Sequence, residues 1–246
     1  ARVTGVQTCA LPIFFACLDS RRMKAKDIEL PNYTPVQEFW NSATHGLGTV
    51  LTLIFGPFLL IKAAKTGDTW SIVGCSIFVF ALLCLYTFSC LYHGLHKNTG
   101  KKVLRVMDHD MVFVLIMGTY APYSLISLRE YSQGWCWGIF GSCILLGIVG
   151  IVLNSCNLKK FAIFSMIDYI LMGWIIVISM VPLSKSMGGF YPGVLLLLLG
   201  GISYTVGAVL YGVGKKHSPW WHTVFHVFVL LGTILMFASI YYYVVA

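Results

Sequence analysis

The chain has 246 residues, a mean hydropathy of +0.80 and only 11% charged residues. A soluble domain carries roughly 25% charged residues, so this composition excludes an ordinary soluble protein and predicts an integral membrane protein. The formal net charge of +8 includes no long basic run, so we expect no nucleic-acid partner. In membrane proteins the basic residues instead report topology.

The first residues need separate treatment. Residues 3–13 match the translation of a common sequencing-adapter oligonucleotide, so we expect residues 1–13 to be a library artefact rather than native protein. The alternative is a short signal peptide with an apolar stretch near Leu11–Leu18. We expect residues 14–35 to form a short cytoplasmic N-terminal segment and residues 36–246 to form the membrane domain.

Seven apolar windows follow, each close to the length of about 20 residues that a helix needs to span the hydrocarbon core. They cover residues 43–61, 71–93, 108–128, 135–153, 162–183, 192–213 and 222–245. The breaks between them are short and polar, and the second break runs from His96 to Arg105. Short breaks favour antiparallel neighbours, so the expected fold is an all-α bundle of seven transmembrane helices.

Lysine and arginine are distributed unevenly around these windows. Twelve of them lie in the N-terminal segment and in the breaks after the second, fourth and sixth windows, whereas the other breaks hold four. The positive-inside bias predicts a cytoplasmic N-terminus and an extracytoplasmic C-terminus. With this orientation all seven histidines fall at the cytoplasmic face, which scattered structural histidines would not be expected to do.

Three of these histidines are candidate ligands of one metal ion. His93 ends the second window, while His222 and His226 lie four residues apart and therefore on one face of the seventh helix. Three imidazoles with an open fourth position are a familiar catalytic zinc arrangement. A single histidine near a helix end is more often an interfacial or core residue. The convergence of both helices at one membrane face nevertheless favours a zinc site.

Two further residues are candidate catalytic groups. Asp108 opens the third window and could orient or deprotonate a water molecule at the metal. Ser89 lies one turn before His93 and could hydrogen-bond that water. Asp108 could alternatively cap the N-terminus of the third helix, where a carboxylate accepts backbone hydrogen bonds.

Other polar residues of the windows are expected to support the site rather than to bind metal. In the first helix they share one face at a spacing of three to four residues. The candidates for support are Glu38, Asn41, His45, His109 and Asp168. Asp110 lies on a different helix face from Asp108, and we expect it to be an interfacial residue.

Together these motifs resemble the hemolysin III proteins, a branch of the progestin and adipoQ receptor superfamily. The matching elements are Glu38-x-x-Asn41-x-x-Thr44-His45-Gly46, Ser89-x-x-x-His93, Asp108-His109 followed by Gly118-Thr119-Tyr120-Ala121-Pro122, and His222-x-x-x-His226. The resemblance implies seven helices with an internal N-terminus and zinc held by the three histidines, with Asp108 and Ser89 around its water. It also implies metal-dependent amide hydrolysis of membrane lipids.

Three functions stay open at this point. The first is a zinc-dependent intramembrane hydrolase acting on a lipid amide or ester, as a ceramidase does. The second is a non-enzymatic receptor or regulator of membrane lipid state that holds a structural zinc, and the third is a membrane-lytic or channel protein. Membrane lipids are the expected partners, no soluble partner is evident, and the plasma membrane is the expected location rather than an internal membrane.

Overall fold

The computed structural model describes residues 27–245. The artefact expected at residues 1–13 lies outside the described residues, as does the greater part of the N-terminal segment expected at residues 14–35. Within the described range every regular element is a helix, and none is a strand.

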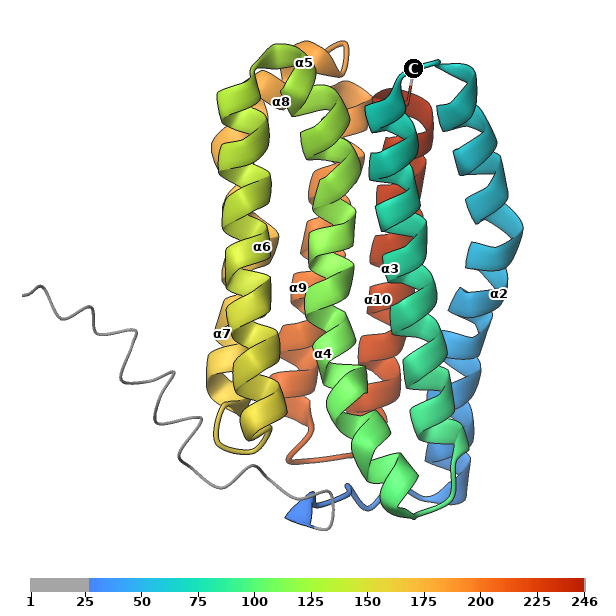
Figure 1. The fold of residues 1–246 in the computed structure, drawn as a ribbon. Helices are drawn as coiled ribbons and strands as arrows, with labels where there is room; N and C mark the ends of the chain where they lie inside the picture. The colour runs from blue at the N-terminus through green and yellow to red at the C-terminus, as the bar shows by residue number, and fades with distance from the viewer. Residues whose placement is uncertain (1–26, 246) are drawn as a thin grey trace, which may run out of the picture.

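Seven spans among the described residues are long and apolar enough to cross a membrane (Figure 1). They are α2 (Pro35–Lys65), α3 (Thr69–Gly94), α4 (Thr99–Pro122) continued by η2 (Tyr123–Leu128) and α5 (Arg129–Tyr131), α6 (Gln133–Cys156), α7 (Ala162–Trp174) continued by η3 (Ile175–Ser179) and α8 (Met180–Ser186), η4 (Phe190–Val194) with α9 (Leu195–Gly214), and α10 (Trp220–Ser239) with η5 (Ile240–Val244). The predicted all-α bundle is confirmed, and the protein is a multi-pass integral membrane protein.

The first span, α2, begins eight residues before its apolar window because its start is strongly capped. The side chain of Thr34 accepts a hydrogen bond from the backbone N–H of Gln37, and the side chain of Gln37 accepts one from the backbone of Thr34. This reciprocal capping box satisfies two otherwise unpaired donors, and Pro35 suits the first helical position. The added turns bring Glu38 and Asn41 into the helix.

The third span, α4, also begins early, and this corrects two expectations. Its N-cap is Asn98, whose side chain accepts a hydrogen bond from the backbone N–H of Lys101. Most of the break expected from His96 to Arg105 is therefore helical. Asp108 lies well inside α4, so the capping role considered for Asp108 is wrong.

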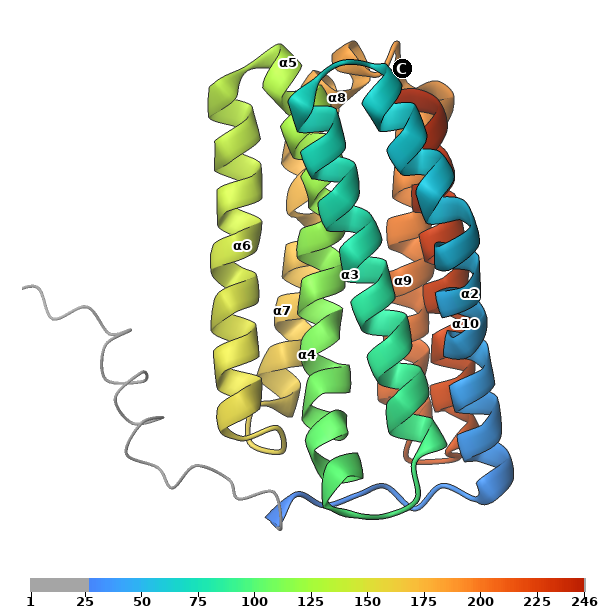
Figure 2. The ribbon, with the colours of Figure 1, turned by 45° about the vertical axis from the view of Figure 1, so that its right-hand side comes forward.

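The helices form a ring in chain order (Figures 1 and 2). α3 lies between α2 and α4, α6 packs on α4, and α7 packs on α6. α9 adjoins α7 and pairs closely with α10, which contacts α2 and closes the ring. Such a ring follows from the short connections, since consecutive helices must pack as antiparallel neighbours. It also brings the first and last spans together.

The outer surface is apolar, as a lipid-facing surface must be. Phe80, Leu145 and Ile163 are examples of large hydrophobic side chains that are 65%, 65% and 72% exposed. Close helix contact inside the ring depends on small residues: at Gly118 of α4 an added Cβ would lie 2.2 Å from the Cβ of Ala81 on α3. The orientation of the bundle in the membrane stays a prediction from the charge distribution.

Candidate metal centre and its cavity

The three predicted ligands meet at the end of the bundle where α2 begins, here called the site end. His93 comes from the last turn of α3, and His222 and His226 come from the first two turns of α10. One ligand atom from each ring lies within 4.8 Å of the other two, and all three residues are buried. The described structure therefore contains a buried three-histidine group that could hold a metal ion.

Hydrogen bonding fixes which nitrogen of His93 is free. Its Nδ1 lies 2.6 Å from Oε2 of Glu38. Because an ionised carboxylate only accepts hydrogen bonds, Nδ1 must carry the proton, which leaves the lone pair of Nε2 for a metal. A carboxylate behind a ligating imidazole is a common arrangement, and it makes the ligand more basic. Glu38, expected as support, is placed where it can act in that way.

Residues of α2 also determine which nitrogen of His226 is free to bind a metal. Its Nδ1 lies 3.1 Å from the backbone carbonyl oxygen of Asn41 and 3.2 Å from Oγ1 of Thr44. Donation to the carbonyl leaves Nε2 of His226 as the metal-binding atom. Asn41 makes a second contact between α2 and α10, because its Oδ1 accepts a hydrogen bond of 2.5 Å from Oγ1 of Thr223.

The spacing of the donors fits zinc. Two nitrogens bound tetrahedrally to one zinc at about 2.0–2.1 Å lie about 3.3 Å apart. Nε2 of His93 and Nε2 of His222 are 3.1 Å apart. Without a metal ion, the same contact would be an N–H···N hydrogen bond in which one of the two nitrogens donates to the lone pair of the other. A shared metal ion gives both lone pairs a partner, so the residues present fit the ion that the sequence led us to expect.

Polar atoms without partners gather around this point. Oγ of Ser89 and Nδ1 of His222 are buried and have no hydrogen-bond partner among the described residues. Both ring nitrogens of His45 share this condition, and the His45 ring stacks on that of His226 with centroids 3.6 Å apart. Buried polar groups are normally satisfied, so these atoms indicate that a polar ligand or water belongs here.

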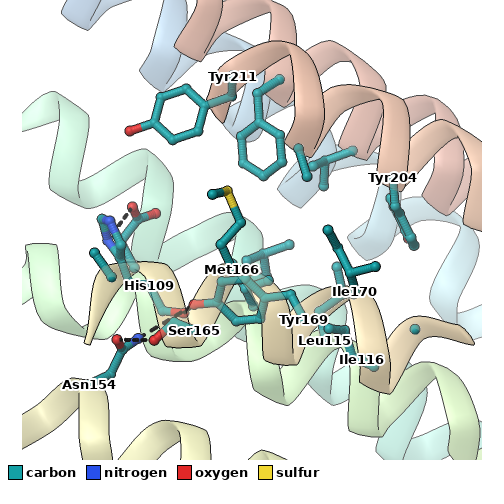
Figure 3. A pocket seen from close by; sticks show the side chains of 18 of the residues that line it. His109, Leu115, Ile116, Asn154, Ser165, Met166, Tyr169, Ile170, Tyr204 and Tyr211 are labelled. Carbon is teal, nitrogen blue, oxygen red and sulfur yellow. Dashed lines mark hydrogen bonds and ion pairs between the residues drawn. The ribbon is translucent and has the colours of Figure 1, made fainter. Parts of the chain in front are cut away.

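A cavity of about 840 Å³ opens beside the histidines and extends along the interior of the bundle. Asp108, His45, His222 and His226 are among its lining residues. Figure 3 shows Tyr204 and Tyr211 facing Leu115, Ile116 and Tyr169 across the cavity. Its volume lies in the range of small-molecule and cofactor pockets. One end of the cavity is therefore polar and beside the candidate metal centre, whereas the rest is mostly apolar.

The remaining predicted residues differ in whether they line the cavity. Oδ2 of Asp108 is 3.6 Å from Nδ1 of His109, and the same nitrogen donates to the carbonyl of Arg105 at 2.9 Å. His109 also lines the cavity, whereas Ser89 is fully buried and is not among the lining residues. Asp168 is buried on α7 but is not among the residues that line the cavity.

Sequence reasoning overlooked Lys101, which the charge count assigned to a loop. It lies in the first turn of α4 and is only 2% exposed. Its Nζ contacts Oε1 of Glu38 at 2.7 Å and donates to the carbonyls of Leu95 at 2.9 Å and His93 at 3.4 Å. The signal that could have found it is Asn98, a good N-cap residue three positions earlier.

The segment 27–34 crosses the site end of the bundle (Figure 1). The ring of Tyr33 stacks on that of His222 with centroids 5.4 Å apart, and burial raises the pKa of the Tyr33 hydroxyl. Arg105 donates to the backbone carbonyl of Glu29, whose carboxylate pairs with Lys159 at 2.9 Å. The segment therefore covers the histidines from outside the bundle.

Comparison with known proteins identifies the relatives of this chain. The Haemolysin-III related family matches residues 33–237. A hemolysin-3 homolog of Bacillus subtilis is 38% identical over 218 residues, which cover 87% of this chain and 97% of that protein. Hemolysin-3 of Bacillus cereus is 35% identical over 208 residues, which cover 85% and 92% of the two chains. The chain therefore belongs to the haemolysin III family, within the progestin and adipoQ receptor superfamily.

Proposed function

We propose that this protein is a zinc-dependent hydrolase of a membrane lipid amide or ester. The observation that carries the proposal is the buried meeting of His93, His222 and His226 at the polar end of an interior cavity. The three rings would hold the metal through nitrogen atoms, which suit zinc. A zinc ion there would supply Lewis acidity toward a carbonyl group and make water ionisable near neutral pH.

Residues of the chain would supply the general base, a hydrogen bond to the attacking water and the orientation of the histidine rings. Asp108 lines the cavity beside the histidines and would accept the proton of the attacking water as a general base. Ser89 offers a buried hydroxyl with no hydrogen-bond partner among residues 27–245, and this hydroxyl would hydrogen-bond the same water. Glu38 and Asn41 hold two of the rings in a fixed orientation through their Nδ1 atoms.

The cavity supports a lipid substrate. Away from the histidines its lining is dominated by apolar and aromatic side chains from several helices, among them Leu85, Leu115, Ile176, Leu197 and Met236. An acyl chain would lie along this lining and would exchange its contacts with membrane lipid for contacts with these apolar side chains. The carbonyl of the amide or ester would then sit at the polar end, within reach of Asp108.

Metal content and turnover test the proposal together. Purified protein should contain about one zinc ion per chain, held through three imidazoles. After reconstitution it should hydrolyse a fluorescent ceramide or a fluorescent acyl ester. His226→Ala should lose both the metal and the hydrolysis. His217→Ala is the matched control, because His217 is exposed in the turn between α9 and α10, and it should keep both.

Other outcomes identify the alternatives. Zinc bound without any hydrolysis, together with loss of folding in His226→Ala, would point to a structural zinc in a receptor or regulator. Dye release from liposomes that survives removal of the metal would point to a lytic or channel protein. Hydrolysis that continues after complete removal of the metal would contradict the proposal.

A further inference from the structure

Residues 27–34, here called the strap, cover the mouth of the cavity, which is its end at the site end of the bundle. Figures 1 and 2 show the strap crossing this end of the bundle before α2 begins. Ile28 is only 6% exposed, and the ring of Tyr33 lies 5.4 Å from that of His222 and 5.9 Å from that of His93. The residues of the strap that line the cavity are Asp27, Ile28 and Glu29. The strap therefore covers the cavity and two candidate metal ligands together.

Polar contacts between the strap and the bundle are few and exposed. The carboxylate of Glu29 pairs with Nζ of Lys159 at 2.9 Å, but the two side chains are 73% and 78% exposed. Oδ1 of Asn32 accepts a hydrogen bond of 3.2 Å from Lys97, also at the surface. Exposed pairs of this kind contribute little to stability, because water solvates the separated groups well.

The backbone of the strap is not hydrogen-bonded into the bundle in a regular way. Within the described part of the chain, no backbone–backbone hydrogen bond joins residues 27–33 to a helix of the bundle. The side chain of Arg105 donates to the carbonyl oxygen of Glu29, and Ile28 and Tyr33 supply the buried contacts. Segments with few buried contacts open at a low cost in free energy. The strap can therefore detach while the seven spans stay packed.

Charge also favours the closed position of the strap. The cationic side chains that line the cavity come from the bundle and its connections, whereas the strap adds two carboxylates. The cations are Arg105, Lys159 and Lys215, and the carboxylates of the strap are those of Asp27 and Glu29. Without the strap, Asp108 is the one carboxylate left among the described lining residues. Opening therefore makes the mouth positively charged, and added salt should favour opening because it screens this attraction.

We propose that residues 27–34 open and close the mouth of the cavity over the candidate metal ligands. Ile28 and Tyr33 hold the closed position by burial, and Glu29 holds it by its ion pair with Lys159. The open position admits water and polar solutes to the histidines. As regulation of the proposed hydrolase this inference rests on that function, but the opening itself can be measured without turnover.

Limited proteolysis of the protein in nanodiscs measures the opening. Chymotrypsin can cut after Tyr33 only when the strap leaves the bundle, because a protease binds several extended residues around the bond that it cuts. The rate of this cut follows the open population when opening and closing are fast. The fragment that begins at Thr34, identified by its mass, should appear slowly, and faster as NaCl is added. Cleavage of a free peptide in the same reaction corrects for effects of salt on the protease.

Three variants separate the contacts that hold the strap closed. Ile28→Ala removes the buried anchor and should raise the cleavage rate roughly tenfold or more. Glu29→Gln removes an exposed ion pair, so it should raise the rate about two- to fivefold and remove most of the salt dependence. Lys160→Gln is the matched control, because Lys160 is the exposed neighbour of Lys159 and its Nζ lies 5.3 Å from the ring centroid of Phe161 instead. This variant should leave the rate unchanged.

A second measurement tests whether the open strap uncovers the histidines. Diethyl pyrocarbonate modifies accessible imidazoles, and mass spectrometry locates the modified residue. In chelator-treated protein, His222 should be modified faster in Ile28→Ala than in the unsubstituted chain. The exposed His217 should react at the same rate in both. This measurement needs neither zinc nor turnover, so it remains valid if the proposed hydrolysis is not found.

Two results would overturn the proposal. Equal cleavage after Tyr33 in Ile28→Ala and in the unsubstituted chain would mean that the buried contact does not hold the strap. Faster cleavage in Ile28→Ala without faster modification of His222 would mean that the strap opens without uncovering the site. The substituted positions lie outside the seven spans, so the unfolding temperature should stay unchanged, which shows that the bundle itself is intact in each variant.

Discussion

Glu38 of α2 and His93 of α3 are joined by a hydrogen bond of 2.6 Å between Oε2 and Nδ1. This contact fixes the imidazole so that Nε2 points toward His222, 3.1 Å away. Lys101 contacts the other carboxylate oxygen, so a chain of three side chains from three helices ends at the candidate metal. Residues that are not candidate ligands therefore hold one of the candidate ligands in place.

Substitution Glu38→Gln should lower zinc affinity by about 10–100-fold, the effect typical of partners that orient a metal-ligating histidine. The amide keeps the shape of the side chain but loses the charge that makes His93 more basic. Competition with a fluorescent zinc chelator measures the change. Glu130→Gln, an exposed glutamate at the opposite end of the bundle, should leave the affinity unchanged, and equal losses in both variants would count against the assignment.

Lys101→Met should destabilise the protein by about 3 kcal/mol, because it leaves a poorly solvated carboxylate without its partner. The double variant Glu38→Gln with Lys101→Met should lose less stability than the sum of the single variants, since the two side chains interact directly. Chemical unfolding followed by tryptophan fluorescence gives these values. Lys97→Met is the control, as Lys97 is exposed and its ammonium donates a hydrogen bond of 3.2 Å to the side chain of Asn32 rather than pairing with a buried carboxylate. Strict additivity would argue that the ion pair contributes nothing.

Asp108→Asn should reduce the turnover number by about 10²–10⁴-fold while zinc content stays the same, because an amide cannot accept the proton of the attacking water. Hydrolysis assays and elemental analysis on one protein preparation separate the two effects. Loss of zinc in this variant would make Asp108 a metal ligand instead. Full activity with zinc retained would remove Asp108 from the catalytic group.

Gly201→Leu should shorten the acyl chains that the protein accepts. Gly201 lines the cavity, and a Cβ added there meets no atom within 4 Å, so the larger side chain would fill the cavity without strain in the helix. Competition between short-chain and long-chain substrates should show the shift as a change in relative kcat/KM. Gly141→Leu on α6 has equal room but lies outside the cavity, so it should leave chain-length preference unchanged.

The spans and the three histidines could be predicted from the sequence because each depends on a local pattern. Apolar length specifies a membrane span, and the spacing of four places His222 and His226 on one helix face. Short connections then leave few ways to arrange neighbouring helices. The contact between His93 and this pair follows from the closure of the ring, in which α10 returns to α2.

The early start of α4 could not be predicted from hydropathy, because its first turns are polar. They are helical because Asn98 caps them and because Lys101 is neutralised by Glu38, more than sixty residues earlier in the chain. A pairing across that distance has no local signature. The same limitation hid the surroundings of Asp110, which is only 6% exposed rather than interfacial and accepts a hydrogen bond from Ser155 of α6.

X-ray absorption at the zinc edge of the purified protein tests the central claim most directly. If the three histidines hold zinc as proposed, we expect one zinc ion with a shell of imidazole nitrogens at about 2.0–2.1 Å. His222→Ala should remove a ligand from that shell or empty the site. A shell of sulfur ligands at about 2.3 Å, or protein that folds fully and binds no zinc when zinc is supplied, would contradict the three-histidine metal centre.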